Sequence, residues 1–119
     1  MNNRDIVITR IIKELGIPAN VGGYDCVKYA VELMINDPGL KKAITKELYP
    51  MVGKKFNISA SRAERRIRYA ITRGWFNADT EIQMLLFGHS VSREKGQPTN
   101  SEFICAVVEY ILSSERNEE

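Results

Sequence analysis

The sequence is poor in the residue types that build most catalytic and metal-binding sites. Its 119 residues include one histidine, His89, and two cysteines, Cys26 and Cys105, which lack the spacing of a metal site. Both cysteines lie in apolar helical patterns, so we expect buried free thiols. His89 follows a glycine, which favours a surface or helix-end position, and the sequence places no nucleophile or carboxylate pair beside it. We therefore expect no enzyme, no metal site and no cofactor.

Long apolar runs are also missing. No segment approaches the roughly 18–20 consecutive apolar residues of a membrane-spanning helix. The first residues, MNNRDIVITR, lack the apolar centre of a signal peptide. The apolar content of 44% and the charged content of 27% are ordinary for a globular protein, which argues against wholesale disorder. We expect a cytoplasmic protein, with no membrane contact, folded as one domain over residues 1–119.

Charge is distributed unevenly along the chain. The formal net charge is +2, yet residues 41–75 hold ten of the 17 basic residues and only two of the 15 acidic ones, Glu47 and Glu64. A basic segment in an otherwise acidic chain is expected where one face of a domain meets a polyanion such as nucleic acid. The alternative is a solvated helix face whose counter-charges are brought near by folding.

Helical periodicity runs through almost the whole chain, without strand alternation, repeats or low-complexity segments. We predict an all-α fold of about six helices. Gly16 and the Asp37-Pro38-Gly39 triplet are helix stops, Asp79 is a predicted N-cap, and TNSE at 99–102 is a capping-box pattern. The predicted helical segments are DIVITRIIKELG, YDCVKYAVELMIND, residues 40–48, a helix starting near Pro50, residues 60–74, TEIQMLLFG and a last helix that opens at Thr99; HSVSREKGQP is a polar loop.

The stretch PMVGKKFNISASRAERRIRYAI follows the pattern of a helix-turn-helix, which we predict at about 50–74. A short helix contains a small residue, Gly53, and ends at an apolar anchor, Phe56. Asn57 tolerates the left-handed backbone of a tight turn, Ile58 is expected to point inward, and a serine then caps a second helix. Two such helices cross steeply, so that the second can enter the major groove of DNA.

The second helix of this motif has an apolar side and a strongly cationic side. At about 100° per residue, Arg65 lies almost opposite the apolar cluster. Arginine pairs bidentately with guanine and glutamate accepts from cytosine, so this side is suited to reading bases. The apolar cluster consists of Ala63, Ile67, Ala70 and Ile71, and the polar side carries Ser61, Glu64, Arg66, Arg68, Tyr69 and Thr72 around Arg65.

Several residues of the motif have a second interpretation. Glu64 either contacts a base or closes a capping box with Ser61. Trp75 is either a core residue, which we favour, or a stacking platform. The cationic residues Arg62, Arg66 and Arg73 are either phosphate contacts or general surface charge. We expect Lys54 and Lys55 to contact phosphates rather than bases, and the hydroxyl of Tyr69 to be offered to a phosphate.

The order of several short motifs resembles one known family. The segments ELGIPA, ITKELYP, KKFN, SASRAERRIR, LFG and QPTNSEFI occur nearly end to end as in the C-terminal DNA-binding domain of the master response regulator of sporulation initiation. The resemblance implies a helical transcription-factor domain that binds a box similar to TGTCGAA, with two copies head to tail on adjacent boxes. It implies base reading by Glu64, Arg65 and Arg68, and backbone contacts from Ser61 and Arg62.

The resemblance also has implications beyond the base contacts. The region from Trp75 to Phe87 corresponds to the part that touches a sigma factor of RNA polymerase, although its GWFNADTEIQML segment departs from the usual pattern. Tyr69 stands where the family often has histidine, and Arg66 where it often has a small residue. No phosphoacceptor receiver domain precedes this segment, so we expect an excised effector domain rather than a stand-alone protein.

Two functional hypotheses follow from the sequence. The first is a sequence-specific DNA-binding regulator in which Glu64, Arg65 and Arg68 read bases. Its backbone contacts are Lys54, Lys55, Ser61, Arg62, Arg66 and Tyr69. The alternative is a protein-interaction module that modulates a full-length regulator without reading DNA itself.

Overall fold

The computed structural model describes residues 3–88 and 96–117 of the chain, and every regular element in those ranges is helical. His89 and most of the predicted polar loop lie outside the described residues. The predicted all-α class with six α-helices is confirmed for the described ranges. The elements are α1 (Asn3–Glu14), α2 (Tyr24–Asn36), η1 (Pro38–Lys42), η2 (Ile44–Leu48), α3 (Tyr49–Phe56), α4 (Ala60–Trp75), α5 (Thr80–Phe87) and α6 (Asn100–Asn117).

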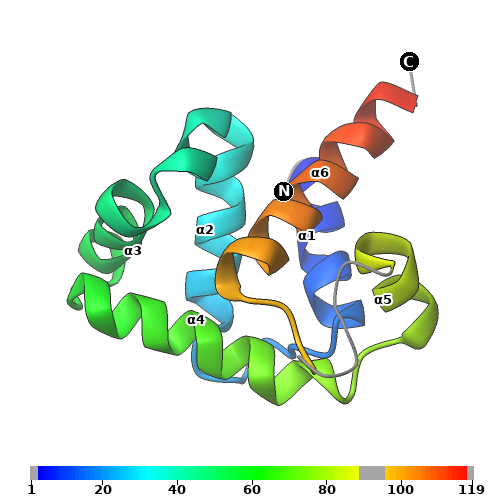
Figure 1. Ribbon diagram of the computed structural model, residues 1–119, viewed down its shortest axis with the longest axis horizontal. Coiled ribbons are helices and arrows are strands. Elements are labelled where there is room, and N and C mark those ends of the chain that lie inside the picture. The colour runs from blue at the N-terminus through cyan, green and yellow to red at the C-terminus, as the bar shows by residue number, and fades with distance from the viewer. Residues whose placement is uncertain (1–2, 89–95, 118–119) are drawn as a thin grey trace.

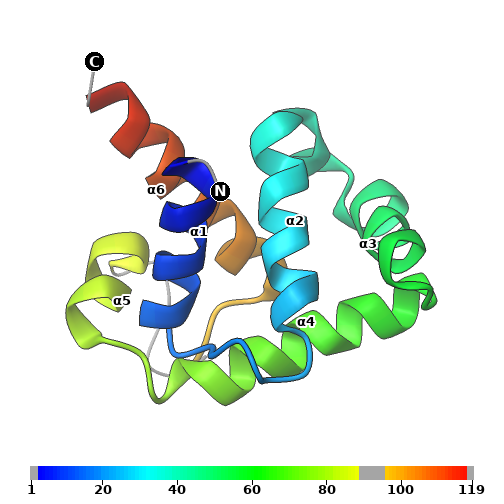
Figure 2. The same ribbon diagram turned by 180° about the vertical axis from the view of Figure 1, so that it is seen from behind.

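Helix α4 forms one edge of the molecule, and the other helices are arranged on it (Figure 1). Helices α1 and α2 stand on α4, α3 lies across its N-terminal end, and α5 lies beyond its C-terminal end. Seen from behind, the connection between α1 and α2 runs along α4 (Figure 2). Helix α6 packs against α1, α2 and α4, so it closes the core on the remaining side. None of the described helices covers the side of α4 that faces away from the body of the molecule (Figure 1).

The core consists of the apolar faces that the periodicity predicts. Burial of these side chains supplies the main driving force for folding, at about 25 cal/mol per Å² removed from water. Cys26 is buried as expected, whereas Cys105 is only half-buried, with its Sγ 3.9 Å from Sδ of Met34. The first two helices and the last helix contribute these buried positions: Ile8, Ile11, Ile12, Leu15, Tyr24, Val27, Ala30, Val31, Met34, Ile35, Phe103, Ile104, Val107, Val108 and Ile111.

The predicted continuous helix over 40–48 is wrong. Asp37 accepts a hydrogen bond from the backbone N–H of Gly39 (3.1 Å) and starts a 3-10 turn, η1, in which Leu40 is buried. Ala43 leaves helical geometry at φ −138° and ψ 39°, which divides the segment. The wide turn η2 follows, with the N–H of Leu48 bonded to the carbonyl of Ala43, and runs directly into α3.

The predicted stop at Gly16 and the predicted caps at Asp79 and Thr99 are confirmed. Gly16 has a φ of +89°, which an L side chain rarely adopts, and it follows the end of α1. Asp79 accepts from the N–H groups of Glu81 and Ile82 and caps α5. Thr99 and Glu102 form a reciprocal capping box at 2.8 and 3.1 Å, so the start of α6 is fixed by its own sequence.

Candidate nucleic-acid interface

The turn between α3 and α4 is held by a close backbone approach. Asn57 has φ 57° and ψ 45°, the left-handed geometry expected for it. The N–H of Ile58 donates to the carbonyl of Gly53 (2.9 Å), and a Cβ at Gly53 would lie 2.5 Å from the carbonyl oxygen of Ile58. Phe56 and Ile58 are half-buried beneath the turn. Glycine is therefore required at position 53 for the two helices to meet this closely.

Ser59, and not Ser61, caps α4. Its Oγ accepts from the backbone N–H of Arg62 at 3.1 Å, and its φ and ψ of −70° and 160° are extended. This corrects the capping-box interpretation of Glu64, which lies too far along the helix to complete a box with Ser59. Ser61 is exposed in the first turn of α4, where its hydroxyl faces solvent.

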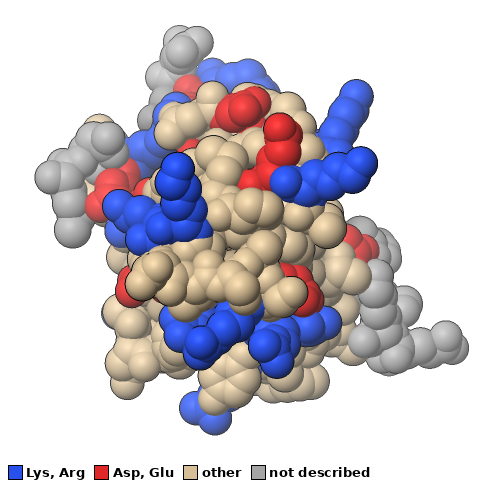
Figure 3. All heavy atoms as spheres, turned by 90° about the vertical axis from the view of Figure 1, so that its left-hand side faces the viewer, with Lys and Arg blue, Asp and Glu red and all other residues tan. Residues whose placement is uncertain are grey.

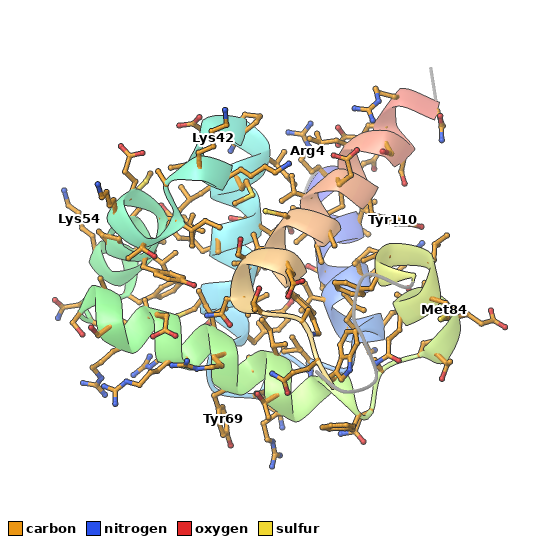
Figure 4. All side chains as sticks on the ribbon, in the orientation of Figure 1. Arg4, Lys42, Lys54, Tyr69, Met84 and Tyr110 are labelled. Atoms are coloured by element: carbon orange, nitrogen blue, oxygen red, sulfur yellow. The ribbon has the colours of Figure 1, made fainter. Side chains whose placement is uncertain are left out.

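Helix α4 separates into two sides as its spacing predicts. The apolar residues are buried, and Trp75 is buried with its ring 5.1 Å from that of Phe87, so the stacking-platform interpretation is wrong. On the other side, basic side chains gather along the lower edge of the molecule, where α4 runs (Figure 3). Tyr69 projects away from the body of the protein (Figure 4). The exposed residues of this side are Ser61, Arg62, Arg65, Arg66, Arg68, Tyr69 and Thr72, and Glu64 is half-buried.

Two of the predicted base-reading residues form an ion pair with each other. Nη2 of Arg68 lies 2.7 Å from Oε1 of Glu64, one helical turn away, and the two side chains are 55% and 31% exposed. An exposed pair at this spacing contributes only a few tenths of a kcal/mol. The pair therefore orients the guanidinium without locking it, whereas Arg65 has no ion pair among the described residues.

Buried Asn100 fastens the turn of α4 that carries Glu64 to two other helices. Its Nδ2 donates to the backbone carbonyl of Glu64 (3.0 Å) and to the hydroxyl of Tyr49 on α3 (3.2 Å). Burial raises the pKa of Tyr49, and the hydrogen bond from Asn100 acts in the opposite direction. The sequence does not indicate this contact, because Asn100 lies there only within a capping-box pattern. The amide of Gln97 adds a second link, to the hydroxyl of Thr72 (3.0 Å).

The connection between α1 and α2 touches α4 on its other flank through glycines. A Cβ on Gly16 would lie 2.0 Å from the carbonyl oxygen of Gly74, and one on Gly23 would lie 2.2 Å from that of Arg66. Both glycines have φ near +90°, so neither position accepts a side chain without strain. Beside this contact lies a hollow of about 590 Å³, the arginine hollow, lined by Gly22, Arg62, Arg65, Arg66 and Tyr69.

The two lysines predicted to hold phosphates lie in the last turn of α3. Lys54 is exposed and projects from the end of the molecule formed by α3 (Figure 4). The ammonium of Lys55 lies 5.6 Å from the ring centroid of Tyr29, which in turn meets Phe56 edge to face at 5.9 Å. The cation–π contact restricts Lys55 to one side of α3. The structure thus places Lys54 and Lys55 near the turn, off the strip of α4 that carries the arginines.

No group of three or more His, Cys, Asp or Glu side chains within residues 3–88 and 96–117 is arranged to hold a metal ion. None of the described helices is long and apolar enough to cross a bilayer. The one buried thiol near α4, Cys26, has its pKa raised by burial, against a smaller opposite influence of Arg66. A raised pKa leaves the thiol protonated and a poor nucleophile at neutral pH.

The family model described as sporulation initiation factor Spo0A C terminal matches residues 8–111. The chain belongs to this family. The match includes the whole helix-turn-helix. Among the described helices, it leaves out only the beginning of α1 and the end of α6. The family resemblance derived from the sequence motifs is therefore confirmed. As a member of the Spo0A C-terminal family, the chain is a DNA-binding domain that regulates transcription in sporulation. The family is not a known enzyme family.

Proposed function

We propose that the chain binds a TGTCGAA-like box in duplex DNA, with α4 in the major groove. Glu64, Arg65 and Arg68 read bases, the two arginines pairing with guanine O6 and N7 and the glutamate accepting from cytosine N4. The observation that carries this proposal is the exposed side of α4, which has three acceptor or donor groups of the right kind within two turns. Because Arg68 and Glu64 are already paired, they can meet a guanine and a neighbouring cytosine as a unit.

Backbone contacts in this proposal come from the flanks of the base-reading strip. Arg62, Arg66 and Tyr69 surround the arginine hollow, where a phosphate would meet two guanidinium groups and a phenol. Ser61 offers its hydroxyl at the N-terminus of α4, where negative charge is favoured. Lys54 and Lys55 would hold the backbone from the end of α3. These contacts position the duplex but carry no sequence information.

A fluorescence-anisotropy titration tests the proposal. The chain is titrated against a duplex carrying TGTCGAA and a scrambled duplex, at two salt concentrations. We expect clear preference for the box and strong salt dependence on both duplexes, because base contacts specify and phosphate contacts release counterions. Equal binding to both duplexes would refute box reading and leave a general basic surface.

The same titration with two variants separates the two kinds of contact. Arg65→Ala should cost about 1–3 kcal/mol on the box and relax specificity, whereas Lys55→Ala should weaken both duplexes alike. Equal losses on both duplexes for Arg65→Ala would remove Arg65 from the base-reading set. Binding to neither duplex by the unaltered chain would favour the alternative, a module that modulates a full-length regulator.

We propose in addition that the region after α4 contacts a protein, with a sigma factor of RNA polymerase as the first candidate. Phe76, Met84 and Leu85 are large apolar side chains, and they are 78%, 52% and 62% exposed. Apolar side chains exposed to this extent favour a protein contact. A Phe76→Ser variant should lose co-purification with the sigma factor while its preference for the box is unchanged.

Two copies lying head to tail on adjacent boxes would be tested by titrating a duplex with one box against a duplex with two.

A further inference from the structure

A second hollow flanks α4 on the side opposite the arginine hollow. It has a volume of about 670 Å³ and lies between η1, η2, α4 and the segment 97–101. We call it the lysine groove, because Lys41, Lys42 and Lys46 line it and all three are exposed. Lys42 projects from the edge of the molecule remote from Tyr69, so the groove extends from α4 toward that edge (Figure 4).

The charge of the lysine groove is not balanced from within the described part of the chain. No carboxylate there forms an ion pair with Lys41, Lys42 or Lys46. The acidic residue of α4 that lines the groove, Glu64, is paired with Arg68, so it does not neutralise the lysines. Three like charges within six residues repel one another, and an anionic partner would offset this cost.

The groove is continuous with the proposed base-reading strip. Glu64 and Arg68 belong to both, since they line the groove and lie on the exposed side of α4. At about 100° per residue, these two residues point to one flank of α4, and Arg62, Arg66 and Tyr69 point to the other. The two hollows therefore lie on the two flanks of one helix.

We propose that the lysine groove holds the second sugar-phosphate backbone of the duplex that α4 reads. This inference rests on the proposed function and extends it to residues outside the helix-turn-helix. A helix in the major groove, which is about 12 Å wide, has one phosphate strand on each flank. In helix-turn-helix proteins the helix before the recognition helix also crosses the backbone, and η1 and η2 directly precede α3. The arginine hollow serves one strand and the lysine groove the other.

Salt-dependent titrations of paired variants test this assignment. The groove variant is Lys42→Ala with Lys46→Ala, and the control is Arg10→Ala with Lys13→Ala on α1. Both variants remove two exposed positive charges, so the net charge is matched. Each phosphate contact adds about 0.9 to the slope of log K against log salt. We expect the groove variant to flatten the slope by about two and to weaken binding roughly 30-fold at about 0.15 M salt, equally on box and scrambled duplexes.

The outcomes separate this proposal from the one on which it rests. An equal effect of the groove and control variants would overturn the groove assignment and leave only a net-charge effect. The same variants are also titrated with a poly-glutamate peptide. If the groove variant binds DNA unchanged but no longer binds this peptide, the groove assignment is overturned in favour of an acidic protein partner. If the unaltered chain shows no preference for the box, box reading fails, yet the slopes on either duplex still decide whether the groove contacts phosphate. Circular dichroism and urea unfolding confirm that each variant is folded.

Discussion

Replacing Asn100 by aspartate tests whether the buried amide fastens α4. The side chain is 8% exposed, and both Nδ2 hydrogens are used, one on the carbonyl of Glu64 and one on the hydroxyl of Tyr49. Asn100→Asp keeps the shape but replaces the donor by an oxygen that faces the carbonyl at about the same distance. The substitution thus converts an attraction into a repulsion at the backbone carbonyl of Glu64.

The expected magnitude follows from three opposing contributions. The hydrogen bond to the carbonyl of Glu64 is lost at a cost of about 0.5–1.5 kcal/mol, whereas the hydroxyl of Tyr49 can turn and donate to the carboxylate. Burying a carboxylate oxygen against the carbonyl of Glu64 adds about 1–3 kcal/mol. Because position 100 is the first residue of α6, a negative charge there regains at most about 1 kcal/mol from the helix dipole. We expect the free energy of unfolding to fall by about 2 kcal/mol.

Urea unfolding followed by circular dichroism measures this loss. Tyr49→Phe is the matched control, since it removes only the hydroxyl partner and should cost no more than about 1.5 kcal/mol. The Asn100→Asp variant should also lose part of its preference for the box in its folded fraction, because the peptide of Glu64 is no longer held. A stability change below that of Tyr49→Phe would refute the reasoning.

Three further predictions concern other parts of the chain. Gly53→Ala should destabilise the protein despite the better helix propensity of alanine, because its Cβ would lie 2.5 Å from the carbonyl of Ile58; a raised midpoint in thermal unfolding would contradict this. Arg65→Ala should lower the box-to-scrambled affinity ratio about 10-fold or more in anisotropy titrations. The hydrogen bond from Arg4 lowers the pKa of Glu115 below the ordinary carboxyl pKa of 4.5. The pair therefore stabilises the fold above that pH, and its contribution is lost as the pH falls below it. Thermal unfolding of Glu115→Gln between pH 3 and 7 should therefore show a weaker loss of stability on acidification than the unaltered chain.

The sequence predicted those features that depend on neighbouring residues. Three such features depend only on residues close in the sequence, so the residue types indicate the backbone geometry. They are the left-handed Asn57, the glycine after α1 and the capping box at Thr99. The arginine side of α4 was likewise predictable, because helical periodicity alone separates buried from exposed positions. The sequence did not decide which of two serines, Ser59 or Ser61, caps α4, because they lie only two residues apart.

Features that depend on distant contacts could not be predicted. Asn100 is 36 residues from Glu64, and no local pattern indicates that its amide reaches that carbonyl. The contact of Gly23 with Arg66 likewise exists only once the connection between α1 and α2 has packed on α4. The division of the 40–48 segment at Ala43 follows from the burial of Leu40 and Leu48, which depends on the rest of the core.

The close glycine contacts on one flank of α4 and the Asn100 and Gln97 links on the other have a thermodynamic consequence. A recognition helix that is held along both flanks is already ordered before DNA arrives, so association requires little loss of backbone entropy. The heat-capacity change of binding should then reflect only the apolar surface buried at the contact, without the larger negative value that accompanies coupled folding. In calorimetric terms, this domain should behave as a rigid body when it meets its duplex.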